Sequence, residues 1–370
     1  MKILYLLSHD IYLNDGVTKK VESQTITWSK YGHQIKVFNI LLKSNIQDGK
    51  TSLRAEIFFR RNPLSCSKYF QKEVNKFNPD IIYFRFEPYK PFFVKLFRQY
   101  STVFELNTDD VAEQRMEAKQ NYKKLIRYIF NSMTRNLILK YAKGFVGVTN
   151  EICNSPHYKK YNVPSITIPN SINLDNYKVL KVKNEHKKPQ VLFMGKPGFE
   201  WHGIDKIIKL ASNTIDELDF HIVGYESPYE TKLSPNIHFY GFIPKDKYIK
   251  IIEQCDVGIA SSAFHRIPIS EASPLKVREY LTYGLPVILP YKDTMLAQDI
   301  NHYEWILELP NNEDNLLGNK DIIINFCRKM KDVVLYKKDI ETLISSDLLE
   351  MRKLSFFEKI LHCNENKTQH

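Results

Sequence analysis

The sequence predicts an α/β protein made of two doubly wound, Rossmann-like domains, each built on a parallel β-sheet. Two observations lead to this fold class. The chain has 370 residues, which exceeds the size at which a single hydrophobic core usually stops growing. Short apolar runs that suit buried strands alternate with longer amphipathic stretches that suit helices, and this alternation is typical of parallel sheets.

The amino-terminal half follows this alternation from its first residues. Strands are expected at residues 2–7, 34–40, 55–59, 80–85, 102–106, 145–149 and 165–168, and helices at residues 18–31, 68–77, 91–99 and 112–142. Because apolar runs of this length suit strands buried on both faces, we predict one doubly wound domain over residues 1–172.

A polar, lysine-rich run over residues 173–189 interrupts the pattern and predicts a linker. A second α/β domain is expected over residues 190–339. Its strands are expected at residues 191–194, 219–223, 237–240, 257–260 and 286–289, and its helices at residues 204–212, 245–254 and 274–283. Residues 340–370 are expected to form a helix and tail that pack back toward the amino-terminal domain.

Composition and charge narrow the class of partner. The formal net charge is +11, which favours an anionic partner such as a nucleotide diphosphate, an anionic lipid surface or a nucleic acid. The five cysteines, Cys66 among them, have no metal-ligand spacing, so we expect reduced thiols. No uncharged apolar run is long enough to cross a membrane, and the apolar start at residues 3–7 is too short for a signal peptide. We therefore expect a cytoplasmic protein.

The most informative loop runs from Glu271 to Glu279 and leads into a helix. Ser273 suits the N-cap of this helix, Pro274 its first position and Gly284 the position just after its end. Loops of this kind follow strands of parallel sheets, which is where ligands bind in such folds.

This loop has the groups that a diphosphate flanked by two sugars requires. The backbone amides of Leu275 and Lys276 are unpaired at a helix amino terminus and favour an anion. Glu271 and Glu279 on either side accept hydrogen bonds from hydroxyl groups. The alternative is that Glu271, Arg278 and Glu279 are solvated surface charges; the capped helix around them favours the binding site.

Two further loops follow the first strand of each domain. In the second domain, Lys196 and His202 are candidates for charge-assisted contacts with phosphate oxygens. Their alternatives are a solvated loop lysine and a polar residue at a helix start. The glycine spacing here is not that of a dinucleotide site, so NAD and FAD gain no support. In the first domain, Gly16 permits close approach of the backbone to a ligand, or simply forms a turn.

Together these motifs resemble the GT-B glycosyltransferases, in particular the retaining family called GT4 or glycosyl transferases group 1. The resemblance rests on the E-x7-E pattern of Glu271 and Glu279, the Gly195–Lys196 turn and the Trp201-His202-Gly203 run. It is looser in the first half and covers nearly the whole chain. It implies a GT-B fold with two domains facing a central cleft, an acceptor domain followed by a nucleotide-sugar donor domain.

The resemblance also implies roles for individual residues. Glu271 would contact the transferred sugar, Glu279 the ribose, Lys196 and His202 the diphosphate, and Gly16 the diphosphate from the opposite domain. It implies retention of configuration, with the diphosphate leaving on the face that the acceptor attacks. We expect no metal or other cofactor, because the basic loops already supply the countercharge. Lys196 is then the first choice for stabilising the departing charge.

Two positions depart from the family pattern. Family members usually have lysine where His202 stands, and many have histidine where Asn107 stands. Asn107 can hydrogen-bond a sugar but cannot transfer a proton, so Asp109 or Glu105 are the remaining candidates for acid or base. The adjacent Asp109 and Asp110 also suggest a metal site, although acidic residues after strands commonly cap helices.

Two segments of the first domain, residues 89–98 and 122–140, combine cations with apolar and aromatic residues at helical spacing. Each either rests on an anionic leaflet or packs its apolar stripe on the sheet. We predict a glycan or lipid-linked glycan acceptor in bacterial-type surface polysaccharide synthesis, with peripheral contact at the inner face of the cell membrane.

The sequence therefore predicts a hexosyltransferase that uses a nucleotide-diphosphate sugar. Two alternatives share the fold: a catalytically impaired protein that only binds the nucleotide sugar, and a nucleotide-sugar epimerase. A nucleic-acid-binding module would explain the charge, but the chain has no zinc spacing, no RNA-binding aromatic motif and no concentrated basic run.

Overall fold

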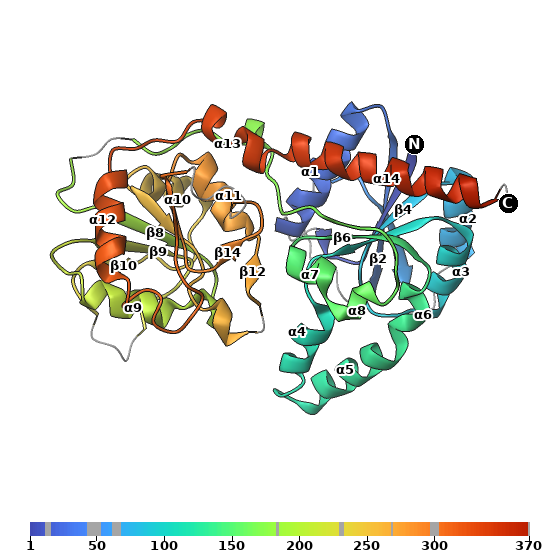
Figure 1. The fold of residues 1–370 in the computed structure, drawn as a ribbon, viewed down its shortest axis with the longest axis horizontal. Helices are drawn as coiled ribbons and strands as arrows, with labels where there is room; N and C mark the ends of the chain where they lie inside the picture. Colours follow the sequence, from blue (N-terminus) through green and yellow to red (C-terminus); the bar gives the residue numbers. More distant parts are fainter. Residues whose placement is uncertain are drawn as a thin grey trace. The chain divides into compact units, whose positions relative to one another are not determined.

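The computed structural model describes residues 1–11, 16–42, 53–60, 68–182, 185–228, 233–267, 269–296 and 303–368. Cys66 lies outside these ranges. The chain divides into two compact units (Figure 1). Unit 1 comprises Met1–Pro169 and Ser346–His370, and unit 2 comprises Asn170–Ser345. Among the described residues, no helix is both long and apolar enough to span a membrane.

Unit 1 is built on a seven-stranded sheet in the order β3-β2-β1-β4-β5-β6-β7. All its neighbouring strands are parallel. The strands are β1 (Lys2–Leu7), β2 (Gln34–Leu42), β3 (Glu56–Arg60), β4 (Ile81–Arg85), β5 (Thr102–Leu106), β6 (Ala142–Gly147) and β7 (Ser165–Thr167). The predicted doubly wound parallel sheet is confirmed, and each predicted strand is present within a few residues.

The helices of unit 1 are α1 (Gly16–Lys30), α2 (Lys68–Phe77), α3 (Pro91–Gln99), α4 (Asp110–Glu117), α5 (Tyr122–Thr134), α6 (Asn136–Leu139), α7 (Asn150–Asn154), α8 (Pro156–Lys159) and α14 (Ser346–Thr368). The single long helix predicted over residues 112–142 is wrong: α4, α5 and α6 replace it. The first break follows Ala118, and Asn121 then begins a new helix because its side chain accepts a hydrogen bond from the Lys124 N–H at 3.0 Å.

Unit 2 has a six-stranded parallel sheet in the order β10-β9-β8-β11-β13-β15 and a two-stranded parallel sheet of β12 and β14. Its strands are β8 (Gln190–Met194), β9 (Asp219–Val223), β10 (Ile237–Phe239), β11 (Val257–Ile259), β12 (Glu271–Ala272), β13 (Val287–Leu289), β14 (Lys292–Asp293) and β15 (Ile306–Glu308). Its helices are α9 (Ile204–Ser212), α10 (Lys245–Ile252), α11 (Leu275–Thr282), α12 (Lys320–Met330) and α13 (Lys337–Ile344). The sequence did not predict β12, β14, β15 or α12.

The start of the expected linker lies in unit 2. The backbone N–H groups of Leu180 and Lys181 both donate to the carbonyl of Tyr283. Lys181 is buried, and its amine donates to the carbonyls of Asp256 and Met330, each at 2.8 Å. This lysine therefore anchors the segment to the second domain, because its long apolar stem is buried while backbone oxygens satisfy its charge.

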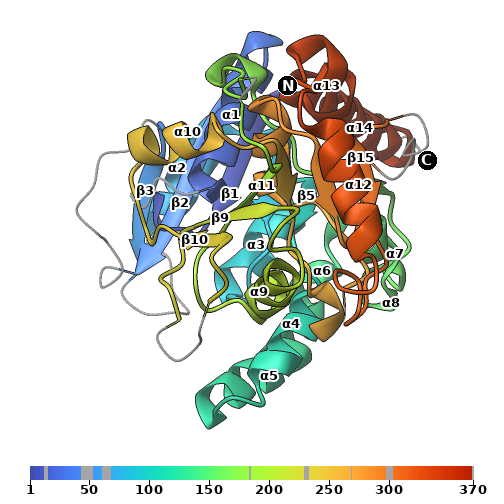
Figure 2. The same ribbon diagram turned by 90° about the vertical axis from the view of Figure 1, so that its left-hand side faces the viewer.

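The helix expected at the end of the chain is interrupted at Ser345, so that α13 belongs to unit 2 and α14 to unit 1. In Figures 1 and 2, α14 runs beside α1. Buried Glu350 joins the two helices: it accepts hydrogen bonds from the Trp28 indole at 2.7 Å and the Gln24 amide at 3.1 Å. The amine of Lys353 also donates to both oxygens of the Glu350 carboxylate, at 2.8 and 2.9 Å.

We expect Glu350→Ala to lower the free energy of unfolding of unit 1 by about 3–5 kcal/mol, because it leaves the buried Lys353 amine without its carboxylate. Differential scanning calorimetry should show a clearly lower melting temperature. Glu358→Ala, on an exposed position of the same helix, is the matched control and should stay within about 0.5 kcal/mol of the wild type. Equal stability of both variants would contradict this account of how α14 is held.

Candidate functional site

The strand order of unit 2 identifies where a ligand would bind. From β8 the chain proceeds to β9 and β10 on one side and to β11, β13 and β15 on the other. Ligands of such sheets bind at the carboxyl ends of the two strands where the order reverses, which here are β8 and β11. Lys196 and His202 follow β8, and Ser261 follows β11. Residues predicted from the sequence thus lie at the switch point of the fold.

The loops after β8 and β11 are joined by their backbones. The N–H groups of Ser262 and Ala263 donate to the carbonyls of His202 and Trp201, each at 3.1 Å. Gly203 lies at this contact with φ +68°, and a Cβ there would come within 2.2 Å of the Ser262 hydroxyl. Glycine is therefore required for both its conformation and its lack of a side chain.

His202 is buried and its imidazole is neutral. Burial, and then the charges of Lys276 and Lys196, lower its pKa to about 3. Its Nδ1 lies 2.6 Å from the Tyr225 hydroxyl, which donates its own proton to the carbonyl of Lys196 at 2.7 Å. Nδ1 must therefore carry the ring proton, and Nε2 is left as an acceptor. This environment argues against the cationic phosphate contact expected for His202.

Lys276 provides a cation close to that histidine. Its amine lies 4.4 Å from the centre of the Phe193 ring and 3.3 Å from the Ser261 hydroxyl. No carboxylate of the described residues forms an ion pair with it, and burial lowers its pKa to about 7. From the sequence we considered only the backbone amide of Lys276. No neighbouring residue in the sequence indicates that its side chain lies beside Phe193 and Ser261.

The helix that follows Glu271 begins one residue later than predicted. Pro274 is the N-cap of α11, and Leu275 is its first residue. Ser273 does not cap the helix, because its hydroxyl accepts the Asn170 N–H at 2.9 Å and its carbonyl accepts the Asn170 amide at 2.6 Å. Within the described ranges, the N–H groups of Leu275 and Lys276 have no acceptor. The anion-binding end of the helix dipole is therefore available. Gly284, with φ +92°, follows the end of the helix as predicted.

Along the chain, one glutamate precedes this helix start and the other follows it. Glu271 is buried in β12, whose partner is β14. Glu279 is half-buried on α11 and accepts a hydrogen bond from the Tyr177 hydroxyl at 3.2 Å. Between them, Arg278 is fully buried in a bidentate pair with Asp293, one bond being 2.8 Å long. The alternative that Arg278 is a solvated charge is wrong. The Arg278 side chain joins α11 to β14 through its pair with Asp293.

Lys196 differs from these buried groups. Its side chain is exposed, with the amine 5.4 Å from the centre of the Phe199 ring. None of the described carboxylates forms an ion pair with this amine. The Lys196 amine is therefore exposed near the switch point, whereas the Lys276 amine is desolvated within it.

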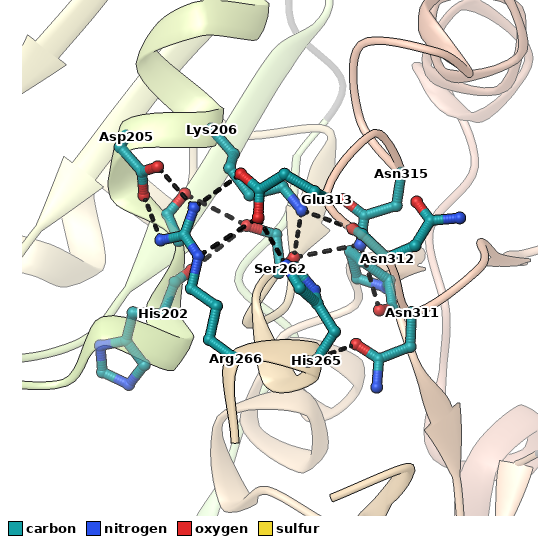
Figure 3. Close-up of polar contacts among 12 residues, drawn as sticks. His202, Asp205, Lys206, Ser262, His265, Arg266, Asn311, Asn312, Glu313 and Asn315 are labelled. Atoms are coloured by element: carbon teal, nitrogen blue, oxygen red, sulfur yellow. Dashed lines mark hydrogen bonds and ion pairs between the residues drawn. The ribbon is translucent and has the colours of Figure 1, made fainter. Parts of the chain in front are cut away.

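A network of charges braces the loop after β11 (Figure 3). Arg266 forms a bidentate pair with Asp205 at 2.9 and 2.7 Å and also contacts Glu313 at 2.8 Å. The Lys206 amine donates to the carbonyl of Ser262 at 2.9 Å and to that of Asn312 at 2.7 Å. The network fixes the switch-point loop against α9 and the segment before α12. Sequence reasoning missed it, because its members are far apart in the chain.

The candidates of unit 1 also follow strands. Gly16 is the first residue of α1. Asn107 accepts a hydrogen bond from the Lys20 amine at 3.0 Å. Asp109 is the N-cap of α4: it accepts from the N–H groups of Val111 and Ala112 at 3.2 and 3.1 Å. The capping role disfavours Asp109 as a catalytic acid or base.

Glu105 and Asp110 are held by neighbouring cations. Burial alone would raise the pKa of Glu105, but Lys20, at 2.8 Å, and Arg85 outweigh it and hold the pKa well below its usual range. Glu105 therefore stays ionised and cannot serve as an acid. Asp110 accepts from Arg135 and Tyr158, each at 2.6 Å. The acidic pair that suggested a metal site is thus engaged by the protein itself.

Residues 178–323 match the family model described as glycosyl transferases group 1. The matched segment lies in unit 2 and contains Lys196, His202, Glu271, Lys276 and Glu279. No curated protein sequence matches the chain.

Solved structures share the whole fold at low sequence identity. Sucrose-phosphate synthase from Thermosynechococcus elongatus is 15% identical with a TM-score of 0.64, covering 98% of this chain and 100% of that one. HepE from Anabaena, in complex with UDP and glucose, is 14% identical with a TM-score of 0.60, covering 97% and 100%. The lipopolysaccharide outer core galactosyltransferase WaaB is 13% identical with a TM-score of 0.50, covering 92% and 98%. These similarities show that the fold is GT-B.

Lys276→Met should change how stability depends on pH. The folded-state pKa of Lys276 is about 7, below the usual value of 10.5. Between these values the unfolded chain binds a proton that the folded chain does not, so wild-type stability should rise with pH over this range. The variant should be the more stable protein at pH 6, and the difference should shrink toward pH 10. Thermal melts at several pH values in this range measure the difference in stability, with the exposed Lys250→Met as control. If the stability of wild type and Lys276→Met changed with pH in parallel, the lowered pKa would not belong to Lys276.

Proposed function

We propose that the chain is a retaining glycosyltransferase of the GT4 type that transfers a hexose-type sugar from a nucleotide-diphosphate sugar. The observation that carries the proposal is the arrangement around α11. Two unpaired amides, at Leu275 and Lys276, lie at the helix start, with Glu271 before them and Glu279 after them in the chain. This is the set of groups that a diphosphate between two sugars requires. The match of residues 178–323 to a glycosyltransferase family model supports it.

Each group then has a distinct task in the donor complex. Glu271 accepts hydrogen bonds from hydroxyls of the transferred sugar, and Glu279 accepts them from the ribose. The amides of Leu275 and Lys276 bind the diphosphate. Because these donors are fixed before the reaction, they stabilise the charge that develops as the diphosphate departs. We propose that no metal is needed.

Lys276 and Lys196 supply the positive charge. Lys276 stands near His202, the position at which family members usually have lysine, so its amine is placed to take over the missing cation. A buried amine with a pKa of about 7 becomes fully charged when an anion binds beside it. Exposed Lys196 adds a second, movable charge at the rim.

Retention with attack from the leaving-group face requires no protein nucleophile. In this proposal the departing diphosphate accepts the acceptor proton, so neither Glu105 nor Asp109 has to titrate. Asn107 contributes a hydrogen bond to the sugar. The neutral His202, together with Asn107 where many family members have histidine, also favours one alternative, a protein that binds the nucleotide sugar without transferring it.

The acceptor we propose is a glycan or lipid-linked glycan in bacterial-type surface polysaccharide synthesis. The similarity of the fold to a lipopolysaccharide outer core galactosyltransferase supports this class. Such a reaction places the protein in the cytoplasm, with peripheral contact at the inner face of the membrane.

A thermal-shift screen of UDP-, GDP-, ADP- and TDP-sugars with EDTA present tests the donor site. We expect one donor to raise the melting temperature of the wild type but not of Glu279→Ala, which loses the ribose contact. The exposed Glu341→Ala is the matched control and should respond as the wild type does. If no donor stabilises the wild type, the glycosyltransferase proposal loses its main support; binding without any donor hydrolysis or transfer would favour the impaired alternative.

Donor affinity should fall as the pH rises above 7, because Lys276 then loses its proton in the free protein. From pH 7 to pH 8.5 we expect the affinity for the stabilising nucleotide sugar to weaken roughly tenfold. Isothermal titration calorimetry of Lys276→Met should give weaker binding without this pH dependence, whereas Lys250→Met should retain it. An unchanged pH profile in Lys276→Met would remove Lys276 from the diphosphate site.

A further inference from the structure

The helix α5 presents its apolar face to solvent. Among its residues only Asn131 is buried. Met133 is 75% exposed, Tyr122 69% and Ile126 61%, and the exposed fractions of Leu125, Ile129 and Phe130 lie between 40% and 47%. Figures 1 and 2 show α5 at the periphery of unit 1, reached through α4. A surface helix normally turns such residues toward the core of its own domain.

The exposed residues form one continuous stripe. Tyr122, Ile126, Ile129 and Met133 follow each other at spacings of three and four, which places them on one side of a helix. Asn131, about half a turn away, points to the domain and donates to Asp110 at 2.7 Å. Arg135, just after α5, also pairs with Asp110 at 2.6 Å. The domain therefore holds this helix by its polar side.

Helix α3 shows that this arrangement is particular to α5. Residues 89–98 have the same mixture of cations and aromatics, yet α3 buries Phe93, Leu96 and Phe97 against the sheet. The alternative that the apolar stripe packs on the sheet is thus correct for α3 and wrong for α5.

The charges beside the stripe favour an anionic surface. Lys123 and Arg127 are exposed along one edge of the stripe, and Lys119 and Lys140 are exposed beyond its two ends. The carboxylate of Glu117 lies 3.8 Å from Lys124 and 4.0 Å from Arg127. A helix with an apolar face bordered by cations is suited to the interface of a bilayer with anionic headgroups.

A second copy of the chain fits this face less well. Thirteen residues of helix measure about 20 Å. Stable protein interfaces usually bury about 800 Å² on each partner, from 20–30 residues. One helix face of this length contributes only a fraction of that area, whereas insertion between lipid headgroups needs no matching partner surface.

We propose that the apolar stripe of α5 inserts into the surface of an anionic membrane while the flanking lysine and arginine side chains contact lipid headgroups. The proposal extends the membrane contact named under the proposed function by assigning it to one surface. It does not depend on sugar transfer.

Sedimentation with vesicles tests the proposal. We expect the full chain to bind vesicles of phosphatidylglycerol and phosphatidylcholine in equal parts at low salt, and to bind pure phosphatidylcholine far more weakly. Ile126→Ser with Met133→Ser should weaken binding at least about 10-fold. Lys123→Gln with Arg127→Gln should weaken it about 25-fold and reduce its salt dependence.

Matched control variants distinguish binding through α5 from non-specific binding to vesicles. Phe242→Ser removes a side chain that is 90% exposed in unit 2, and Lys250→Gln with Lys338→Gln removes two exposed charges there. Both should bind vesicles as the wild type does. Because α5 carries no donor-site residue, its variants should keep the donor-induced thermal shift, which distinguishes failure of membrane docking from failure of the donor site.

Two outcomes would overturn the proposal. One is binding of the α5 variants to anionic vesicles with wild-type affinity. The other is a wild type that is dimeric by light scattering and does not bind vesicles, together with a monomeric Ile126→Ser, Met133→Ser variant. In that case a second copy of the chain covers the stripe.

Discussion

The candidate donor site depends on the close backbone contact between the loops that follow β8 and β11. The carbonyls of Trp201 and His202 accept the N–H groups of Ala263 and Ser262, and this pairing is possible only because Gly203 has no side chain. With the loops joined, the His202 ring is enclosed by Phe193 and Tyr225. The same contact sets Ser261 within reach of the Lys276 amine. The geometry of the site is thus a consequence of strand order combined with one glycine.

Lys276 differs from the other buried charges of the two units, such as the Arg278–Asp293 pair of unit 2. In unit 1, Glu105 and Asp110 lie among cations that neutralise them, so these carboxylates stabilise the domain but have no capacity left for proton transfer. In unit 2, the Lys276 amine is desolvated, and no carboxylate among the described residues forms an ion pair with it. A desolvated amine whose only polar partner in the described part of the chain is a hydroxyl at 3.3 Å is a cost to folding that a bound anion would offset. That difference supports the proposed diphosphate site in unit 2 on physical grounds that are independent of the family resemblance.

The sequence predicted well those elements whose signal is local. Apolar strands such as β1 and β9, and helices such as α3 and α9, appear at the expected residues. The prediction failed where residues distant in the chain determine a side chain's partner. Ser273 was expected to cap α11, but Asn170, which lies about a hundred residues earlier in the chain, takes its hydroxyl. From the sequence, Arg278 could equally be a solvated charge on the helix, but in the fold Asp293 of β14 lies beside it and pairs with it. Very short strands such as β12 and β14 have too few residues to show any periodicity.

The contrast between α3 and α5 illustrates the same limit and gives it a functional meaning. Both segments have an amphipathic composition, and composition does not determine which side of a helix faces the domain. For α5 the orientation is set by Asp110, which accepts hydrogen bonds from Asn131 on the polar side of α5 and from Arg135 just after the helix. Hydrogen bonds to a buried carboxylate are strong and directional, so they fix the rotation of the helix without help from its apolar residues. Because those residues are not needed to hold the helix in place, they are free to contact something outside the protein, and the cations beside them favour an anionic membrane as that partner.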